Sequence, residues 1–194
     1  MEFGALLLFL FPLAYSPGPG NMLFAANGAR FGFRSTLPAT LGYHLATLLV
    51  TTALGMGFST AVGAAPRALL IVQLAGSLYV LYLAWSLWRS GSIDGAAEAR
   101  PLGFWGGAVL LVLNPKAYVI IALMFSQFLP ASSDLKLVAA IALVFTLNNL
   151  LAFSLWTLVG DALARVFRND SNARLLNRVF GLMLGLVGLW MLLS

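Results

Sequence analysis

Six long apolar segments, separated by short connections, constrain this chain more than any other feature of its sequence. Each segment is long enough to cross about 30 Å of hydrocarbon as an α-helix. The segments cover residues 3–26, 37–62, 67–88, 103–129, 136–160 and 175–193. The two longest polar connections, residues 89–101 and 161–174, are too short to fold as separate domains. The sequence therefore predicts an all-α membrane protein of six transmembrane helices, with residues 1–194 forming a single transmembrane domain.

The composition argues against a soluble protein and against several kinds of chemistry. Hydrophobic residues make up 61% of the 194 residues and charged residues 9%, whereas a soluble domain carries about 25% charged residues. The sequence contains no cysteine, which excludes disulfide bonds, thiol redox chemistry and cysteine-ligated metals. We expect no enzyme activity, no cofactor and no bound metal.

The basic residues are distributed as topology signals. They stand singly between apolar runs, so the net charge of +5 does not predict a nucleic-acid partner. Of the eleven, eight lie at the first, third and fifth connections, two lie on the opposite side, and Lys116 lies inside a span. Because basic flanks stay in the cytoplasm, this bias predicts that both termini lie outside. The eight are Arg30, Arg34, Arg89, Arg100, Arg165, Arg168, Arg174 and Arg178, and the two are Arg67 and Lys136.

The two halves of the chain resemble each other. The first span of each half is interrupted near its middle, at residues 16–21 and 114–116. In the third span of both halves, a glycine precedes a tryptophan by nine residues. Since each half has three spans, the second half must enter the membrane from the opposite side. We therefore predict two inverted three-helix repeats, about 1–88 and 103–194, with helices 1 and 4 broken, as in many transporters. The alternative is that these prolines and glycines only kink the helices.

The first interruption contains two prolines, and each of them lacks a backbone donor. With Gly18 and Gly20 beside Pro17 and Pro19, a regular helix cannot pass through this segment. Unpaired backbone groups are costly in hydrocarbon, so an unwound segment is tolerated only where protein or a water-filled cavity receives it. The sequence thus predicts a cavity at mid-membrane, with these four residues and Asn21 as candidates for substrate binding.

The second interruption predicts an anion site. Asn114 is a favoured N-cap and Pro115 suits the first position of a helix, so a helix can restart here. The positive end of that helix and the ammonium of Lys116 together suit a carboxylate. Lys116 is thirteen residues from Gly103 and thirteen from Leu129, too far to reach an interface, so it should face the interior. It either contacts the substrate or binds the broken backbone of the other half.

Three further polar residues lie inside predicted spans. His44, the only histidine, is either a hydrogen-bonded packing residue or the proton carrier, because imidazole can load and unload a proton near neutral pH. The acidic residues all fall at span ends or in connections. Asn148 and Asn149 lie mid-way along the fifth span, where each amide either lines the cavity or links helices.

Residues 16–19 (Ser-Pro-Gly-Pro) with Asn21, residues 28–32 (Gly-Ala-Arg-Phe-Gly) and residues 114–116 (Asn-Pro-Lys) resemble the lysine exporter (LysE/RhtB) family. The resemblance extends over essentially the whole chain. It implies efflux of amino acids or their derivatives across the bacterial inner membrane, commonly driven by the proton gradient. The position after Pro-Gly-Pro, usually Asn or Asp in this family, is Gly20 here. No carboxylate role remains there, which leaves proton coupling to His44 or to backbone carbonyls.

These observations predict an alternating-access secondary transporter that exports small neutral amino acids or close analogues, in exchange for protons. The substrate carboxylate is expected near residues 114–116 and its ammonium on carbonyls freed around residues 17–21. The absence of a buried acid in the sequence argues against lysine or arginine as substrates. The expected partners are the amino acid, protons and the lipid bilayer, and the oligomeric state is open between monomer and homodimer. Two alternatives are a metal-ion exporter, which would need clustered ligands in the spans, and a structural or regulatory membrane module.

Overall fold

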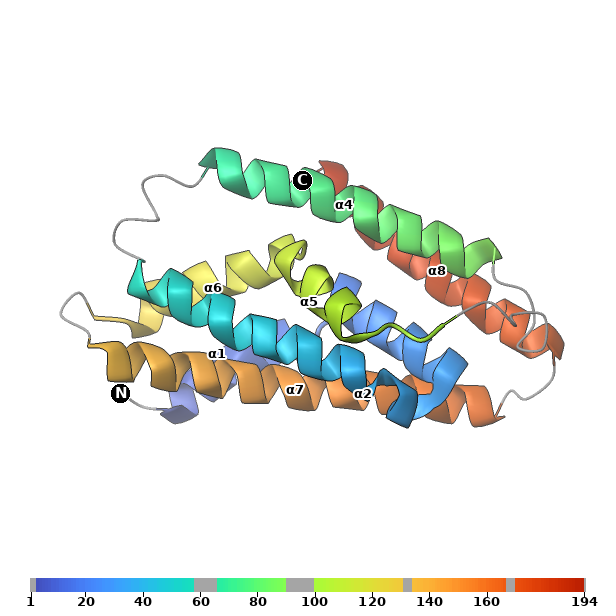
Figure 1. Cartoon of the computed structure of the whole chain (residues 1–194), viewed down its shortest axis with the longest axis horizontal. Helices are drawn as coiled ribbons and strands as arrows, with labels where there is room; N and C mark the ends of the chain where they lie inside the picture. Colours follow the sequence, from blue (N-terminus) through green and yellow to red (C-terminus); the bar gives the residue numbers. More distant parts are fainter. Residues whose placement is uncertain (1–2, 58–65, 90–99, 131–133, 167–169, 194) are drawn as a thin grey trace.

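The structure is a computed structural model that describes residues 3–57, 66–89, 100–130, 134–166 and 170–193. Over these residues the secondary structure is helical, and seven helices are present (Figure 1). They are α1 (Phe3–Tyr15), α2 (Pro19–Met56), α4 (Pro66–Arg89), α5 (Phe104–Val112), α6 (Pro115–Phe128), α7 (Leu135–Val166) and α8 (Asp170–Leu193). The helical class predicted from the apolar segments is confirmed.

The described helices differ in their capacity to cross a membrane. α2 and α7 are each long and apolar enough to do so, and α5 with α6 forms a third candidate span that is bent by 61°. α1 is a shorter apolar helix, as are the apolar parts of α4 (Leu74–Trp85) and α8 (Arg178–Trp190). By length and composition, the described residues therefore give two or three spans and not the six expected from the sequence.

α2 reverses its direction at Gly32 (Figure 1). This glycine has φ 81° and ψ 165°, a conformation that side-chain-bearing residues rarely adopt. A single residue therefore makes the turn, and helical structure continues on both sides of it. We call residues 19–31 the first arm of α2 and residues 33–56 its second arm.

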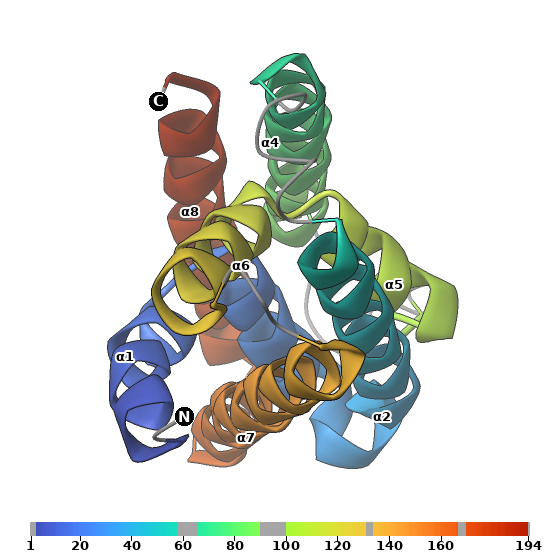
Figure 2. The ribbon, with the colours of Figure 1, turned by 90° about the vertical axis from the view of Figure 1, so that its left-hand side faces the viewer.

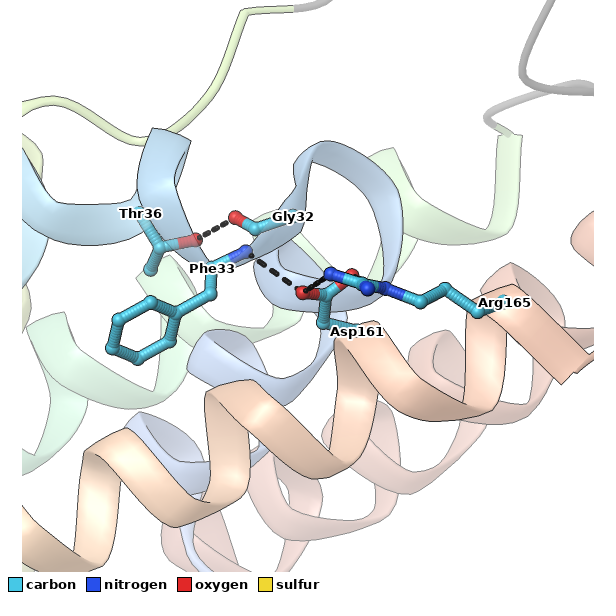
Figure 3. A network of polar contacts seen from close by, with 5 residues as sticks. All are labelled: Gly32, Phe33, Thr36, Asp161 and Arg165. Atoms are coloured by element: carbon cyan, nitrogen blue, oxygen red, sulfur yellow. Dashed lines mark hydrogen bonds and ion pairs between the residues drawn. The ribbon is translucent and has the colours of Figure 1, made fainter.

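A carboxylate from α7 holds this turn (Figure 3). Phe33 N donates to Asp161 Oδ2 at 3.3 Å, and the same carboxylate accepts two hydrogen bonds from Arg165, at 3.1 and 2.8 Å. From the second arm, Thr36 Oγ1 donates to Gly32 O at 3.0 Å. Asp161 thus satisfies an N–H at the start of the second arm, where a helix has no partner of its own for that group.

Glycines bring the arms of α2 into backbone contact with two neighbouring helices. Gly28 and Gly160 lie where the first arm meets α7, and Gly42 and Gly107 lie where the second arm meets α5. A Cβ at any of these four positions would run into a backbone oxygen of the facing helix. Small residues that allow such close approach are the usual means of helix association in a membrane.

We expect Gly160→Ala to destabilise the protein, because the new methyl group would meet the Ala25 carbonyl oxygen and neither backbone can yield easily. The free energy of unfolding should fall by about 1–3 kcal/mol, as for other overpacked sites. Thermal unfolding of the purified protein in detergent measures this. Gly4→Ala is the matched control, since a Cβ at Gly4 would have no atom within 4 Å. Equal melting temperatures for the two variants would contradict the close contact.

The remaining arrangement separates one helix pair from the others. α4 and α8 lie side by side and stand to one side of the rest of the molecule (Figure 2). The turn at Gly32 and the ends of α4 and α7 lie at the same end of the molecule (Figure 1). α4 and α7 each carry an arginine in the last turn, Arg89 and Arg165. The turn at Gly32 and the ends of α4 and α7 correspond to the first, third and fifth connections, which the charge bias assigns to the cytoplasmic side.

Candidate functional site

The first predicted interruption is confirmed, because α1 ends at Tyr15 and α2 begins at Pro19, with Gly18 in an extended conformation between them. The end of a helix leaves carbonyl groups without partners. Here side chains from three helices supply the donors. Asn21 Nδ2 donates to Ala14 O at 2.9 Å, Trp156 Nε1 to Tyr15 O at 3.2 Å, and Lys116 Nζ to Ser16 O at 3.0 Å.

The second interruption is also present, between the end of α5 and the start of α6 at Pro115. Asn114 is the N-cap residue, but its side chain does not cap the helix. Its Nδ2 instead donates to Tyr43 Oη at 3.0 Å, and its Oδ1 is buried without a hydrogen-bond partner. A buried acceptor of this kind is rare in a folded protein and needs an explanation.

Lys116 connects the two interruptions. Its Nζ donates to both Ser16 O and Ser16 Oγ, each at 3.0 Å. The lysine side chain lies over Gly18, where a Cβ would be 3.0 Å from Lys116 Cδ and Nζ. In the described part of the chain no carboxylate pairs with Lys116, since the ion pair found there joins Asp161 and Arg165. Of the two roles open from the sequence, this conformation shows the bond to the backbone of the other half.

A small cavity lies where the two interruptions meet. It has about 20 Å³ of space for the centre of a water molecule, which is room for about one water. An amino acid therefore fits only if the walls move apart. The walls are formed by Leu13 and Ala14 of α1, Asn21 and Tyr43 of α2, Asn114, Lys116, Ala117 and Ile120 at α6, and Phe145, Asn149 and Phe153 of α7.

The structure brings together four of the ten residues that the sequence suggested for substrate binding. The four that line the cavity are Asn21, Asn114, Lys116 and Asn149. The others lie outside its lining: Pro17 is exposed, Pro115 is partly buried, and Gly18, Pro19, Gly20 and Asn148 are buried. Asn148 Nδ2 has no hydrogen-bond partner.

His44 lies directly behind the cavity wall. Its ring is 5.2 Å from that of Tyr43 and 5.4 Å from that of Phe153, both of which line the cavity. Nδ1 is 2.7 Å from Thr40 O, Nε2 is buried and makes no hydrogen bond, and the Asn149 carbonyl is a second backbone oxygen close to the ring. A neutral imidazole that donates from Nδ1 keeps Nε2 as a proton acceptor. The geometry thus suits both a packing role and a proton carrier.

Several residues of the site carry no clear signal in the sequence. Tyr43 and Phe153 form part of the cavity wall. The sequence of an apolar span does not indicate whether an aromatic residue in it faces a cavity or the lipid. The Phe153 ring also requires a glycine at position 20, because a Cβ there would be only 2.7 Å from Phe153 Cζ. The ring fills the space of a side chain at that position. Ser16 is the residue of the site that the sequence could have indicated, since its carbonyl directly precedes the proline break.

The fold and the site define a membrane transporter, because paired helix interruptions that meet at a polar cavity are how such proteins expose backbone and charge to a solute. A sequence model of the LysE type translocator family matches residues 11–194. The chain belongs to this family. It is therefore a transmembrane transporter of an amino-acid efflux family and not an enzyme.

Relatives of known name agree with this assignment. The chain is 30% identical over 173 residues to the cysteine/O-acetylserine efflux proteins of Escherichia coli strain K12, Shigella sonnei strain Ss046 and Escherichia coli O6:K15:H31 strain 536. The matched region covers 88% of this chain and 87% of each relative. No solved structure matches the chain.

Proposed function

We propose that this translocator exports small neutral amino acids or their derivatives across the bacterial inner membrane in exchange for protons. The observation that carries the proposal is the Lys116–Ser16 contact beside the cavity, in which the partners of the lysine ammonium among the described residues are two neutral oxygens. A substrate carboxylate is a stronger partner for this ammonium, since hydrogen bonds between two charged groups are the strong ones. Lys116, with the start of α6, is thus the carboxylate site.

Transport follows from separating the two interruptions. We assign six spans: α1 with the first arm of α2, the second arm, α4, α5 with α6, α7, and α8. Residues 1–88 and 103–194 then form two inverted repeats, with both termini outside. Lys116 and Ser16 belong to different repeats, so rocking one repeat against the other breaks their contact and enlarges the cavity. A bound substrate carboxylate then accepts the hydrogen bonds that Lys116 had donated to Ser16.

The substrate class follows from the charges and the walls. The ionised group on the cavity wall is Lys116, so a zwitterion with a small uncharged side chain fits better than an amino acid with a second positive charge. Leu13, Ala14 and Ile120 give that side chain an apolar surface. The relatives are named for cysteine and O-acetylserine, both small neutral amino acids. His44 carries the proton at Nε2, the ring nitrogen that does not face Thr40 O.

Reconstitution into liposomes tests this function. An acidic vesicle interior should drive accumulation of labelled cysteine, O-acetylserine, serine or alanine, because protons leaving the vesicle exchange for the amino acid. Lysine and arginine should not accumulate. Collapse of the pH gradient with nigericin should abolish the accumulation, and vesicles without protein give the background. Absence of flux for all the neutral amino acids, or flux that ignores the gradient, would contradict the proposal.

A further inference from the structure

Two aromatic rings in contact with each other form one wall of the cavity. The rings of Tyr43 and Phe153 have their centroids 4.5 Å apart, and Phe24 packs edge-on against both, at 5.6 and 5.0 Å. Tyr43 is 1% exposed and Phe153 3% exposed, yet both line the cavity. They come from different helices, the second arm of α2 and α7, and Phe153 has its position because Gly20 leaves the space open.

The same wall holds an unused hydrogen-bond acceptor. Asn114 is 5% exposed, lines the cavity and bonds Tyr43 Oη through Nδ2, which leaves Oδ1 without a partner. A ligand that donates a hydrogen bond would satisfy this atom. A ligand that also carries a positive charge would gain from the two aromatic rings of the same wall, since aromatic rings attract cations.

Four backbone carbonyls beside the first interruption accept hydrogen bonds in this conformation. Asn21, Trp156 and Lys116 donate to the three carbonyls that end α1, and Gly18 O accepts from Met22 N at 2.9 Å. The sequence predicted the substrate ammonium on carbonyls freed around residues 17–21, and Gly18 O is one of these. In the described residues no aspartate or glutamate lines the cavity either.

We propose that the ammonium group of the substrate is bound by Asn114 Oδ1 together with the rings of Tyr43 and Phe153, and not by a carboxylate. This inference rests on the proposed function, because Lys116 takes the carboxylate at the opposite side of the same amino acid. The site holds one positive charge through a neutral acceptor and two aromatic rings. A second cationic group on the substrate would be repelled by Lys116 and would have no carboxylate to pair with among the described lining residues. The site therefore selects monoamino over diamino acids.

Substitution of the ring that lacks a polar group tests the site directly. Phe153→Leu keeps an apolar side chain but removes the ring face, so KM for labelled cysteine and O-acetylserine counterflow should rise about tenfold. Phe180→Leu is the matched control, since Phe180 is a buried ring on α8 that does not line the cavity.

A ligand without an ammonium separates this role from packing. 3-Hydroxypropionate, which is serine without its amino group, should inhibit O-acetylserine counterflow equally well in the wild type and in Phe153→Leu, whereas inhibition by serine should weaken about tenfold in the variant. Equal weakening for both inhibitors, or none for serine, would overturn the ammonium site. Both outcomes leave the proposed function intact. If the wild type exchanges neither labelled amino acid, the proposed function fails and the site with it.

A reciprocal change should admit a diamino acid. Gly20→Asp alone brings the new side chain against Phe153 Cζ, which lies 2.7 Å from the Cβ position. Combined with Phe153→Ala, it places a carboxylate in the vacated space. We expect labelled lysine counterflow in the double variant and not in either single variant. Lysine exchange by the wild type as fast as that of O-acetylserine would overturn the selectivity.

Discussion

Lys116→Ala is expected to reduce exchange of neutral amino acids by about 10- to 150-fold, the effect of losing one hydrogen bond to a charged group. The substitution removes the partner of the substrate carboxylate and also leaves Ser16 O without its donor. Counterflow of labelled O-acetylserine in proteoliposomes, with equal pH on both sides, measures the rate without any contribution from the proton gradient.

Lys136→Ala is the matched control for this experiment. Lys136 is also a lysine near the middle of the chain, but it is exposed on the first turn of α7. Its loss changes the net charge by the same amount and should leave the rate within about twofold, as expected for a surface substitution. If the two variants exchange O-acetylserine equally fast, Lys116 does not bind the substrate.

His44→Asn is expected to separate exchange from proton coupling. Asparagine can still donate a hydrogen bond to Thr40 O, but its amide cannot take up a proton at physiological pH. Counterflow at equal pH should therefore persist within about threefold, while accumulation driven by an acidic vesicle interior should disappear. The measurement compares both assays on the same vesicle preparation.

The contrary result for His44 is equally clear. If His44→Asn vesicles still accumulate O-acetylserine against its gradient, another group carries the proton and His44 is a packing residue. If both assays fail together, thermal unfolding of the purified variant shows whether the fold was lost. A folded variant that is inactive in both assays places His44 in substrate binding and contradicts a separate proton site.

The helix interruptions were predictable because they depend on local backbone chemistry. Two prolines with a glycine between them remove two donors within three residues, so residues 17–19 were expected to break the helix, whereas the single prolines Pro12 and Pro38 stand inside helices. The turn at Gly32 was harder to predict. Arg30 and Arg34 suggested a polar connection, whereas the structure continues the helix on both sides of one glycine. That short turn depends on Asp161, which is far away in the sequence.

The membership of the cavity wall was only partly predictable, because sequence position gives the depth of a residue in a span but not the direction in which it points. Adjacent residues on a helix point about 100° apart. Asn149 consequently lines the cavity, and Asn148, at nearly the same depth, does not. Tyr43 and Phe153 reach the wall because two helices present them to the same space. The sequence of one segment alone does not predict which distant helix it will contact.

The glycine contacts described above divide the molecule into a stiff part and a compliant one. The backbone of α2 packs directly against the backbones of α7 and α5, so these helices have little room to shift. The contacts are at Gly28, Gly160, Gly42 and Gly107. α1 and α6, beyond their interruptions, meet through apolar side chains such as Leu10 and Met124. Lipid tails solvate those side chains about as well as protein does, so parting them forfeits little more than dispersion contacts. We therefore expect the rocking of the two repeats to pivot at these four glycine contacts, with α1 and α6 as the helices that move apart.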